Sequence, residues 1–271
     1  DKDTYSAAVM QTNLNTFGAL AIYLDQTPAL KLDLRAACDD LQEALDTTLA
    51  EDAAQPYLSA LEELRSAVQT HQETIDAVNR EYQDALAEGA DQQTLDEIRA
   101  RGRALNSKTL EAFRFVQDHF IGILSTSDIV IKHEAYQDNV ELIEDVIDAL
   151  DQSTLSNEEG NGALDLAWMI NGGTEYGYYS FSVETNTISK SFLLEESNPD
   201  DLFWGTGKGA VLADTYPATV SLLEKAESGD SDFSEDIALY TRELEEQRQL
   251  LQEMIRQESS SMRQLSELLA R

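Results

Sequence analysis

The sequence has a single cysteine and only 19 lysines and arginines, set against 52 aspartates and glutamates. One cysteine, Cys38, cannot form a disulfide within the chain, so noncovalent contacts must hold the fold together. The formal charge of -33 makes the surface repel the phosphates of nucleic acids and anionic lipids, which excludes both as primary partners. No apolar run is long enough to span a bilayer, and no signal peptide is recognisable.

The two ends of the chain also lack expected features. The first residue is Asp1 rather than an initiator methionine, and the chain stops at Arg271 within a helical pattern. We therefore expect an excised piece of a longer protein with an extracytoplasmic location: secreted, lipid-anchored or the ectodomain of a membrane protein. Contact with a membrane is expected only through segments outside this chain.

Residues 56–124 carry the clearest structural signal. Their seam positions recur at alternating steps of three and four, which keeps one face of a helix against a partner. Because only a short turn around Gly89 separates two such runs, the pattern predicts an antiparallel helical hairpin in which His71 lies opposite about Thr109. The seam positions are Leu61, Leu64, Val68, His71, Ile75, Val78, Tyr82 and Ala85, then Leu95, Ile98, Gly102, Leu105, Thr109, Ala112, Val116, His119 and Ile123.

The same spacing predicts further helices on both sides of this hairpin. They cover about residues 3–26, 29–51, 133–150, 211–227 and 232–271. The last of these helices has polar seam positions at Gln247, Glu258 and Ser261, so we expect its far half either to be only partly packed or to be completed by a segment outside this chain. Residues 120–131 fit either two β-branched strands around a polar turn or a buried helical segment. We favour the helix, because helical spacing resumes directly after them.

Residues 172–194 differ from the rest in composition. Aromatic and β-branched residues alternate there with serine and threonine on both sides of a polar turn, which predicts a β-hairpin. The fold class is therefore mainly α: an elongated antiparallel helical bundle of about six or seven helices with one inserted β-hairpin. We expect a single domain over residues 1–271, with an aromatic junction that extends from the hairpin to about residue 210.

Catalytic and metal-binding signatures are missing from the sequence. The glycine run around Lys208 does not fit a phosphate-binding loop, because Leu202 stands where the first glycine belongs and Gly209 where a hydroxyl is needed. The three histidines, His71, His119 and His133, fall on seam positions and are expected to be core residues rather than metal ligands. We therefore expect a protein that is not an enzyme and that holds no cofactor and no metal.

Aromatic residues outside the long helices form the candidate ligand site. Aromatic side chains near glycine-rich loops are typical of a ligand pocket, and equally of a small packing core between the hairpin and the bundle. Of the two, the packing core is the commoner arrangement. The candidate ligand-binding residues are Trp168, Tyr176, Tyr179, Phe181, Trp204 and Lys208.

These observations favour a non-enzymatic sensor or ligand-binding domain in signal transduction. In architecture alone the predicted bundle resembles the helical sensor ectodomains of bacteria, and no motif identifies a family. The expected partner is a small-molecule ligand or another protein, with a homodimer as one arrangement. The alternative is a protein-interaction or membrane-acting protein whose long helices present the β-hairpin at a tip, as helical pore-forming toxins do.

Overall fold

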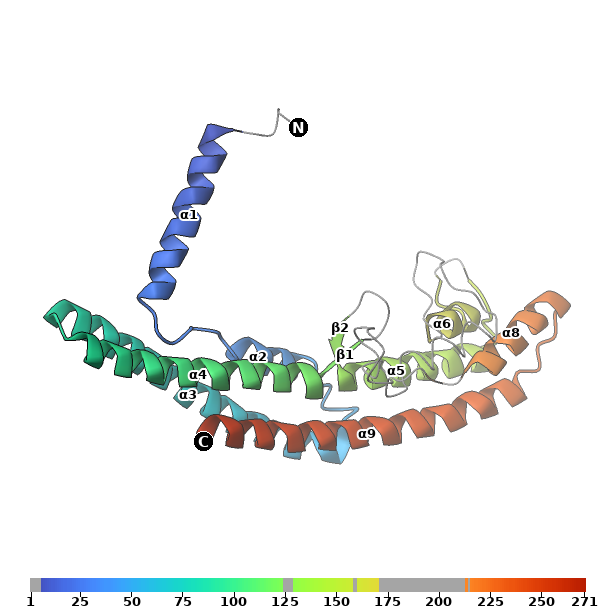
Figure 1. Cartoon of the computed structure of the whole chain (residues 1–271). Coiled ribbons are helices and arrows are strands. Elements are labelled where there is room, and N and C mark those ends of the chain that lie inside the picture. Colours follow the sequence, from blue (N-terminus) through green and yellow to red (C-terminus); the bar gives the residue numbers. More distant parts are fainter. Residues whose placement is uncertain (1–5, 124–128, 158–159, 171–212, 214) are drawn as a thin grey trace, which may run out of the picture. The chain divides into compact units, whose positions relative to one another are not determined.

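The computed structural model describes residues 6–123, 129–157, 160–170, 213 and 215–271. These residues are mainly helical, as predicted, and form eight α-helices and two short strands (Figure 1). The expected count of six or seven helices is therefore not confirmed. The β-hairpin expected at 172–194 lies outside the described residues.

The chain divides into two compact units. Unit 1 comprises residues 1–39, 62–116 and 262–271, and unit 2 comprises residues 40–61 and 117–261. Two long helices, α3 (Ala54–Glu88) and α9 (Ser234–Ala270), contribute residues to both units. The expectation of a single domain stays a prediction.

Unit 1 contains most of the predicted helical hairpin, formed by α3 and α4 (Gln92–His119) (Figure 1). Gly89 sits in the turn with φ +72°, a backbone conformation that glycine adopts without the steric penalty of a Cβ atom. His71 Nε2 lies 2.8 Å from Thr109 Oγ1, which confirms the predicted register. Seam residues buried in this unit include Leu64, Val68, Ile75, Val78, Tyr82, Ile98 and Ala112.

The helix predicted over residues 29–51 is wrong in length, because α2 covers only Arg35–Glu43. Asn79 accepts a hydrogen bond from the Ala29 N–H at 2.9 Å and donates one to the Ala29 carbonyl at 2.8 Å. Asn106 bonds the neighbouring backbone groups in the same two-sided way. The amide groups of Asn79 and Asn106 donate to the Ala29 and Pro28 carbonyls, which a helix starting at Ala29 would use for its first hydrogen bonds. The segment before α2 is therefore not helical.

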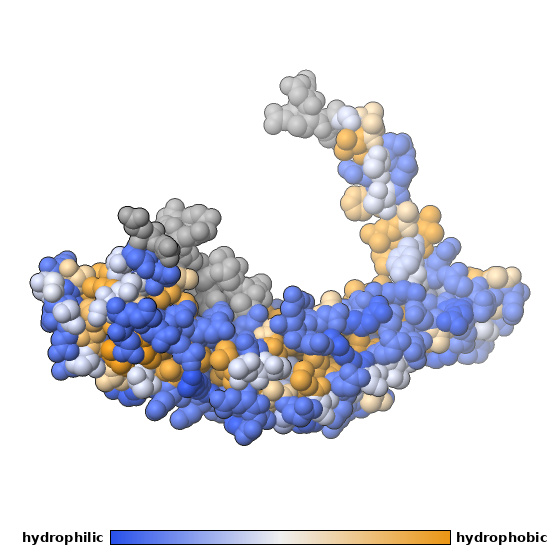
Figure 2. Space-filling model, turned by 180° about the vertical axis from the view of Figure 1, so that it is seen from behind, coloured by the Kyte–Doolittle hydropathy of each residue, from blue (hydrophilic) through white to orange (hydrophobic). Residues whose placement is uncertain are grey.

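The first helix, α1 (Ala7–Asp25), has no buried residue. It begins at Ser6, whose hydroxyl accepts a hydrogen bond from the Val9 N–H at 3.1 Å, the usual N-cap contact. Figure 2 shows apolar side chains along this helix at its upper right. They include Val9, Met10, Leu14, Phe17, Leu20, Ile22, Tyr23 and Leu24, all exposed. Among the described residues, no helix is both long enough and apolar enough to cross a membrane.

Unit 2 contains a pair of short strands, which corrects one expectation. Strands β1 (Ile121–Ile123) and β2 (Ile129–Ile131) pair antiparallel, with Gly122 opposite Val130. The helix favoured for residues 120–131 is therefore wrong. Isoleucine and valine favour extended backbone because two heavy atoms on Cβ restrict their side chains in a helix.

Four helices build the core of unit 2. They are α5 (Lys132–Asp151), α6 (Ala163–Ile170), α8 (Tyr216–Ser228) and the part of α9 that belongs to this unit. Gly229, with φ +75°, ends α8 in the left-handed conformation, which satisfies the last helical carbonyls. The core includes Ile143, Val146, Leu150, Ala167, Leu222 and Tyr240.

Candidate functional site

The residues predicted to bind a ligand fall almost entirely outside the described part of the chain. Tyr176, Tyr179, Phe181, Trp204 and Lys208 all lie between residues 171 and 212. The sixth residue, at position 168, belongs to helix α6, but its side chain is not described. The aromatic junction therefore stays a prediction.

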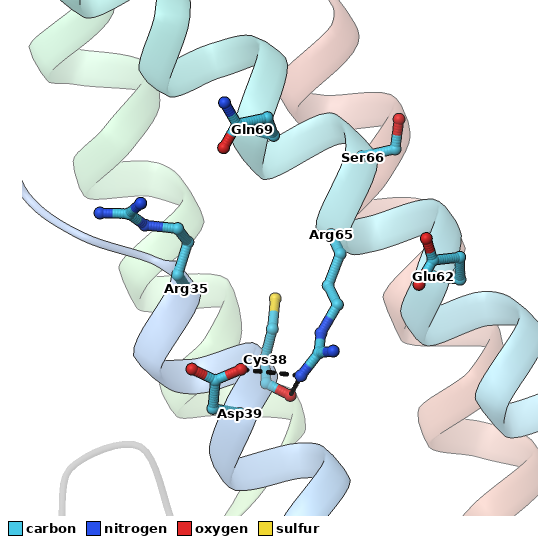
Figure 3. A pocket seen from close by; sticks show the side chains of 7 residues that line it. All are labelled: Arg35, Cys38, Asp39, Glu62, Arg65, Ser66 and Gln69. Carbon is cyan, nitrogen blue, oxygen red and sulfur yellow. Dashed lines mark hydrogen bonds and ion pairs between the residues drawn. The ribbon is translucent and has the colours of Figure 1, made fainter.

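Unit 1 contains a cleft of about 450 Å³ between α2 and α3 (Figure 3). Helix α3 contributes four polar residues at positions i, i+3, i+4 and i+7, which lie on one face of a helix. Helix α2 contributes three residues from its first two turns. The lining residues are Arg35, Cys38 and Asp39 from α2, and Glu62, Arg65, Ser66 and Gln69 from α3.

Arg65 is the residue that joins the two walls of the cleft. Figure 3 shows its side chain reaching from α3 to α2, where Nη2 donates to Asp39 Oδ1 at 2.7 Å and to the Cys38 carbonyl at 3.3 Å. Its Nε is buried and has no hydrogen-bond partner among the described residues. A desolvated donor without an acceptor costs about 1–3 kcal/mol. The guanidinium is therefore anchored at one end and unsatisfied at its centre.

Arg35 brings a second guanidinium to the same cleft. It binds Asp33 through Nε at 2.9 Å and Nη2 at 2.7 Å, and this hydrogen bonding lowers the pKa of the Asp33 carboxyl. The pair is exposed, with 58% of the Arg35 side chain accessible to solvent. Its contribution to stability is therefore small, because water screens exposed ion pairs. The pair is neutral overall, so Arg35 brings hydrogen-bond donors to the cleft but no unpaired positive charge.

Cys38 points its sulfur between the two helices (Figure 3) and is 2% exposed. Burial raises the pKa of its thiol to about 11, since an apolar environment disfavours the thiolate. The thiolate is the nucleophilic and metal-binding form. Cys38 is therefore protonated at neutral pH and lines the cleft as a small apolar side chain.

Two lining groups have hydrogen-bonding capacity that the described residues do not use. The Glu62 carboxylate and the Ser66 hydroxyl make no hydrogen bond or ion pair within the described part of the chain. Both residues are exposed. The cleft thus presents a free carboxylate beside an incompletely satisfied guanidinium, with a hydroxyl one helical turn from the carboxylate.

A second polar cluster lies buried in unit 2. His133 Nδ1 lies 2.6 Å from Glu258 Oε2, and the two side chains are 0% and 1% exposed. The His133 backbone N–H also donates to Glu258 Oε1 at 3.2 Å, and the Tyr57 ring packs edge-on to the imidazole at 5.5 Å. Because solvent does not reach this pair, its physical role is to hold α5 against α9. It accords with the expectation that His133 is a core residue.

Polar seam residues of α9 form hydrogen bonds with side chains of α5 and of α9 itself. Gln247 accepts a hydrogen bond from Asn139 at 3.0 Å and donates one to Glu243 at the same distance. Gln247 and Glu258 are each 1% exposed. The expectation that the far half of α9 is only partly packed is therefore wrong at both positions. Gln247 and Glu258, two of the three polar seam residues, thus have hydrogen-bond partners inside the unit, as buried polar groups usually do.

Sequence reasoning missed the α2–α3 cleft. The available signal was the run of polar residues at 62, 65, 66 and 69, which forms a stripe directly beside the apolar seam of α3. Such a stripe is usually a solvated helix face, and the sequence does not show that α2 packs across it. Among the described residues, no group of three or more histidines, cysteines, aspartates or glutamates is arranged to hold a metal ion.

Comparisons with protein-family models, with curated proteins and with solved structures found no match.

Proposed function

We propose that this chain is a non-enzymatic ligand-binding domain of a signal-transduction protein, and that it binds a small molecule in the cleft between α2 and α3. The cleft volume of about 450 Å³ supports the proposal, because small-molecule sites commonly occupy about 300–1,000 Å³. The single observation that carries the proposal is the state of Arg65, whose buried Nε has no acceptor in the part of the chain that the structure describes. A ligand oxygen that reorients this guanidinium would recover a hydrogen bond that the free protein lacks.

Helix α3 connects the cleft to unit 2, because it lines the cleft and continues into that unit. Four of the seven lining residues belong to α3, and residues 54–61 of the same helix belong to unit 2. A ligand shifts a conformational equilibrium only by its difference in affinity for the two states. A ligand that changes the contact of Arg65 with α2 has such a difference, because it alters how α3 is held in unit 1.

The extracytoplasmic location stays a prediction. The alternative function, a membrane-acting protein that presents a β-hairpin, depends on residues 176–194, which lie outside the described part of the chain. The cleft between α2 and α3 makes small-molecule binding the better supported function.

A thermal-shift screen of the purified chain against amines, carboxylates, zwitterions, sugars and nucleosides tests this proposal. A ligand at one hundred times its dissociation constant adds about 2.7 kcal/mol of stability, which raises the melting temperature of a chain of this size by roughly 5–10 °C. We expect the shift to be lost in Arg65→Gln. It should persist in Arg101→Gln, a control in which the substituted arginine also makes an exposed ion pair in unit 1, with Glu81. The proposal is wrong if no chemical class raises the melting temperature, or if Arg65→Gln responds as the control does.

A further inference from the structure

We infer that the ligand of the α2–α3 cleft is a small zwitterion that carries both a carboxylate and an ammonium group, of which the α-amino acids are the simplest class. This inference rests on the proposed function, because it names the kind of molecule that the cleft binds. Three features of the cleft carry it: its balance of charge, its positive groups and its unpaired carboxylate.

The balance of charge separates the cleft from the rest of the protein. The whole chain has a formal charge of -33, whereas the cleft lining carries two arginines, Arg35 and Arg65, and two acids, Asp39 and Glu62. A ligand with a net negative charge is repelled by the field of the chain before it reaches the cleft. A zwitterion has no net charge to be repelled, and a lining with both signs can hold both of its ends.

The positive side of the cleft suits a carboxylate. Asp39 and the Cys38 carbonyl hold one end of the Arg65 guanidinium through Nη2. The same guanidinium offers a buried Nε–H with no acceptor among the described residues. A ligand carboxylate that accepts from this Nε–H and displaces Asp39 from Nη2 would form the two parallel hydrogen bonds of a guanidinium–carboxylate pair, which set orientation as well as affinity. Arg35 lies on the opposite wall, where its charge is paired with that of Asp33.

The negative side of the cleft suits an ammonium group. Glu62 lies three residues before Arg65 on α3, so the two side chains leave neighbouring positions on the helix surface. They nevertheless form no ion pair with each other. The Glu62 carboxylate is therefore available to a cation, and the Ser66 hydroxyl one turn further along α3 offers an additional acceptor. An amine alone would leave Arg65 unsatisfied, and a carboxylate alone would place its charge close to Glu62.

Matched ligands test the inference directly. The purified chain is screened by thermal shift and titration calorimetry with each protein amino acid and with two analogues of it: the carboxylic acid that lacks the amine and the amine that lacks the carboxylate. We expect at least one amino acid to bind at least tenfold more tightly than both of its analogues. Equal or tighter binding of either analogue would overturn the zwitterion and leave the proposed function standing. If no chemical class in the wider screen raises the melting temperature, both the zwitterion inference and the proposed function are wrong.

Variants then assign the two ends of the ligand. Glu62→Gln removes the ammonium partner at an exposed position and should weaken amino-acid binding at least tenfold. It should not weaken, and is expected to strengthen, binding of the carboxylate analogue, because it removes a negative charge close to that ligand. Glu63→Gln is the matched control, because it removes the same charge from the next residue of the chain, which does not line the cleft. The Glu63 carboxylate makes only a long, exposed ion pair, with Oε2 3.8 Å from Arg263 Nε. Arg65→Lys keeps the charge but not the planar fork, and should also weaken binding. Amino-acid binding that survives both Glu62→Gln and Arg65→Lys would overturn this assignment of the site.

Discussion

His71 shows how burial and hydrogen bonding act on one imidazole. The side chain is 5% exposed, and Nε2 lies 2.8 Å from Thr109 Oγ1. Thr109 donates its only hydroxyl hydrogen to the Leu105 carbonyl at 2.9 Å, so its oxygen must accept from the Nε2–H of His71. Burial, with a smaller contribution from the nearby charge of Lys108, lowers the pKa of His71. The folded state therefore holds this imidazole in its neutral form.

This lowered pKa predicts a loss of stability on mild acidification. The unfolded chain binds a proton at His71 near the ordinary pKa of 6.5, while the folded chain binds it only at lower pH. Between these two values the unfolded state carries more protons, so the free energy of unfolding falls as the pH falls through about 6.5. Urea unfolding at several pH values should show this slope in the wild type and a shallower one in His71→Gln. Equal slopes for the two proteins would contradict the prediction. His119→Gln is the control, because His119 is exposed; the expectation that it is a core residue is wrong.

At the scale of elements, the contact between α4 and the chain segment before α2 constrains a glycine. A Cβ atom added at Gly102 would lie 2.4 Å from the Pro28 carbonyl oxygen and 2.5 Å from its carbon. Both of these are backbone atoms, and Asn79 and Asn106 fix the same segment by hydrogen bonds. The segment therefore has little freedom to move away from α4.

Gly102→Ala should destabilise the protein even though alanine is the better helix former. Overpacking of this kind costs about 1–3 kcal/mol, which exceeds the gain of about 1 kcal/mol in helix propensity over most of that range. Urea denaturation followed by circular dichroism measures the difference. Gly18→Ala is the control, since Gly18 is also helical and no atom lies within 4 Å of its added Cβ. If Gly102→Ala is as stable as Gly18→Ala, the Pro28 backbone moves away from the added methyl group without loss of stability, and the prediction is wrong.

The same segment shows where prediction from periodicity failed. Spacing of apolar residues identified the hairpin of α3 and α4 and the pairing of His71 with Thr109, because a short turn leaves only one register for two long seams. The spacing of residues 29–51 was just as helical, yet α2 begins only at Arg35. The hydrogen bonds of Asn79 to Ala29 join residues fifty positions apart. A local pattern does not contain that information.

For the whole molecule, the dominant physical property is its charge of -33. Repulsion among acidic groups destabilises a compact state, since unfolding moves the charges apart. Ion pairs oppose this effect, but exposed pairs such as Lys31 with Asp76 contribute only about 0–1 kcal/mol each. Repulsion should therefore decide how the stability of the protein responds to salt.

We expect sodium chloride to raise the free energy of unfolding between 0.1 and 1 M, because the screening length falls from about 10 Å to about 3 Å over that range. Urea titration is the appropriate measurement, since guanidinium chloride is itself a salt. Sucrose at matched osmolality controls for the general exclusion of solutes from the protein surface. A protein that loses stability as salt is added would show that its ion pairs outweigh the repulsion.

The residue pattern alone determined the mainly helical class and the α3–α4 hairpin, because both depend on short-range spacing. Only the tertiary structure decided between strand and helix at residues 120–131, where a short apolar run satisfies either backbone. It also decided the partners of Glu258 and the existence of the α2–α3 cleft. These features arise from side chains that folding brings together from distant positions, and their free energy depends on contacts that no local period encodes.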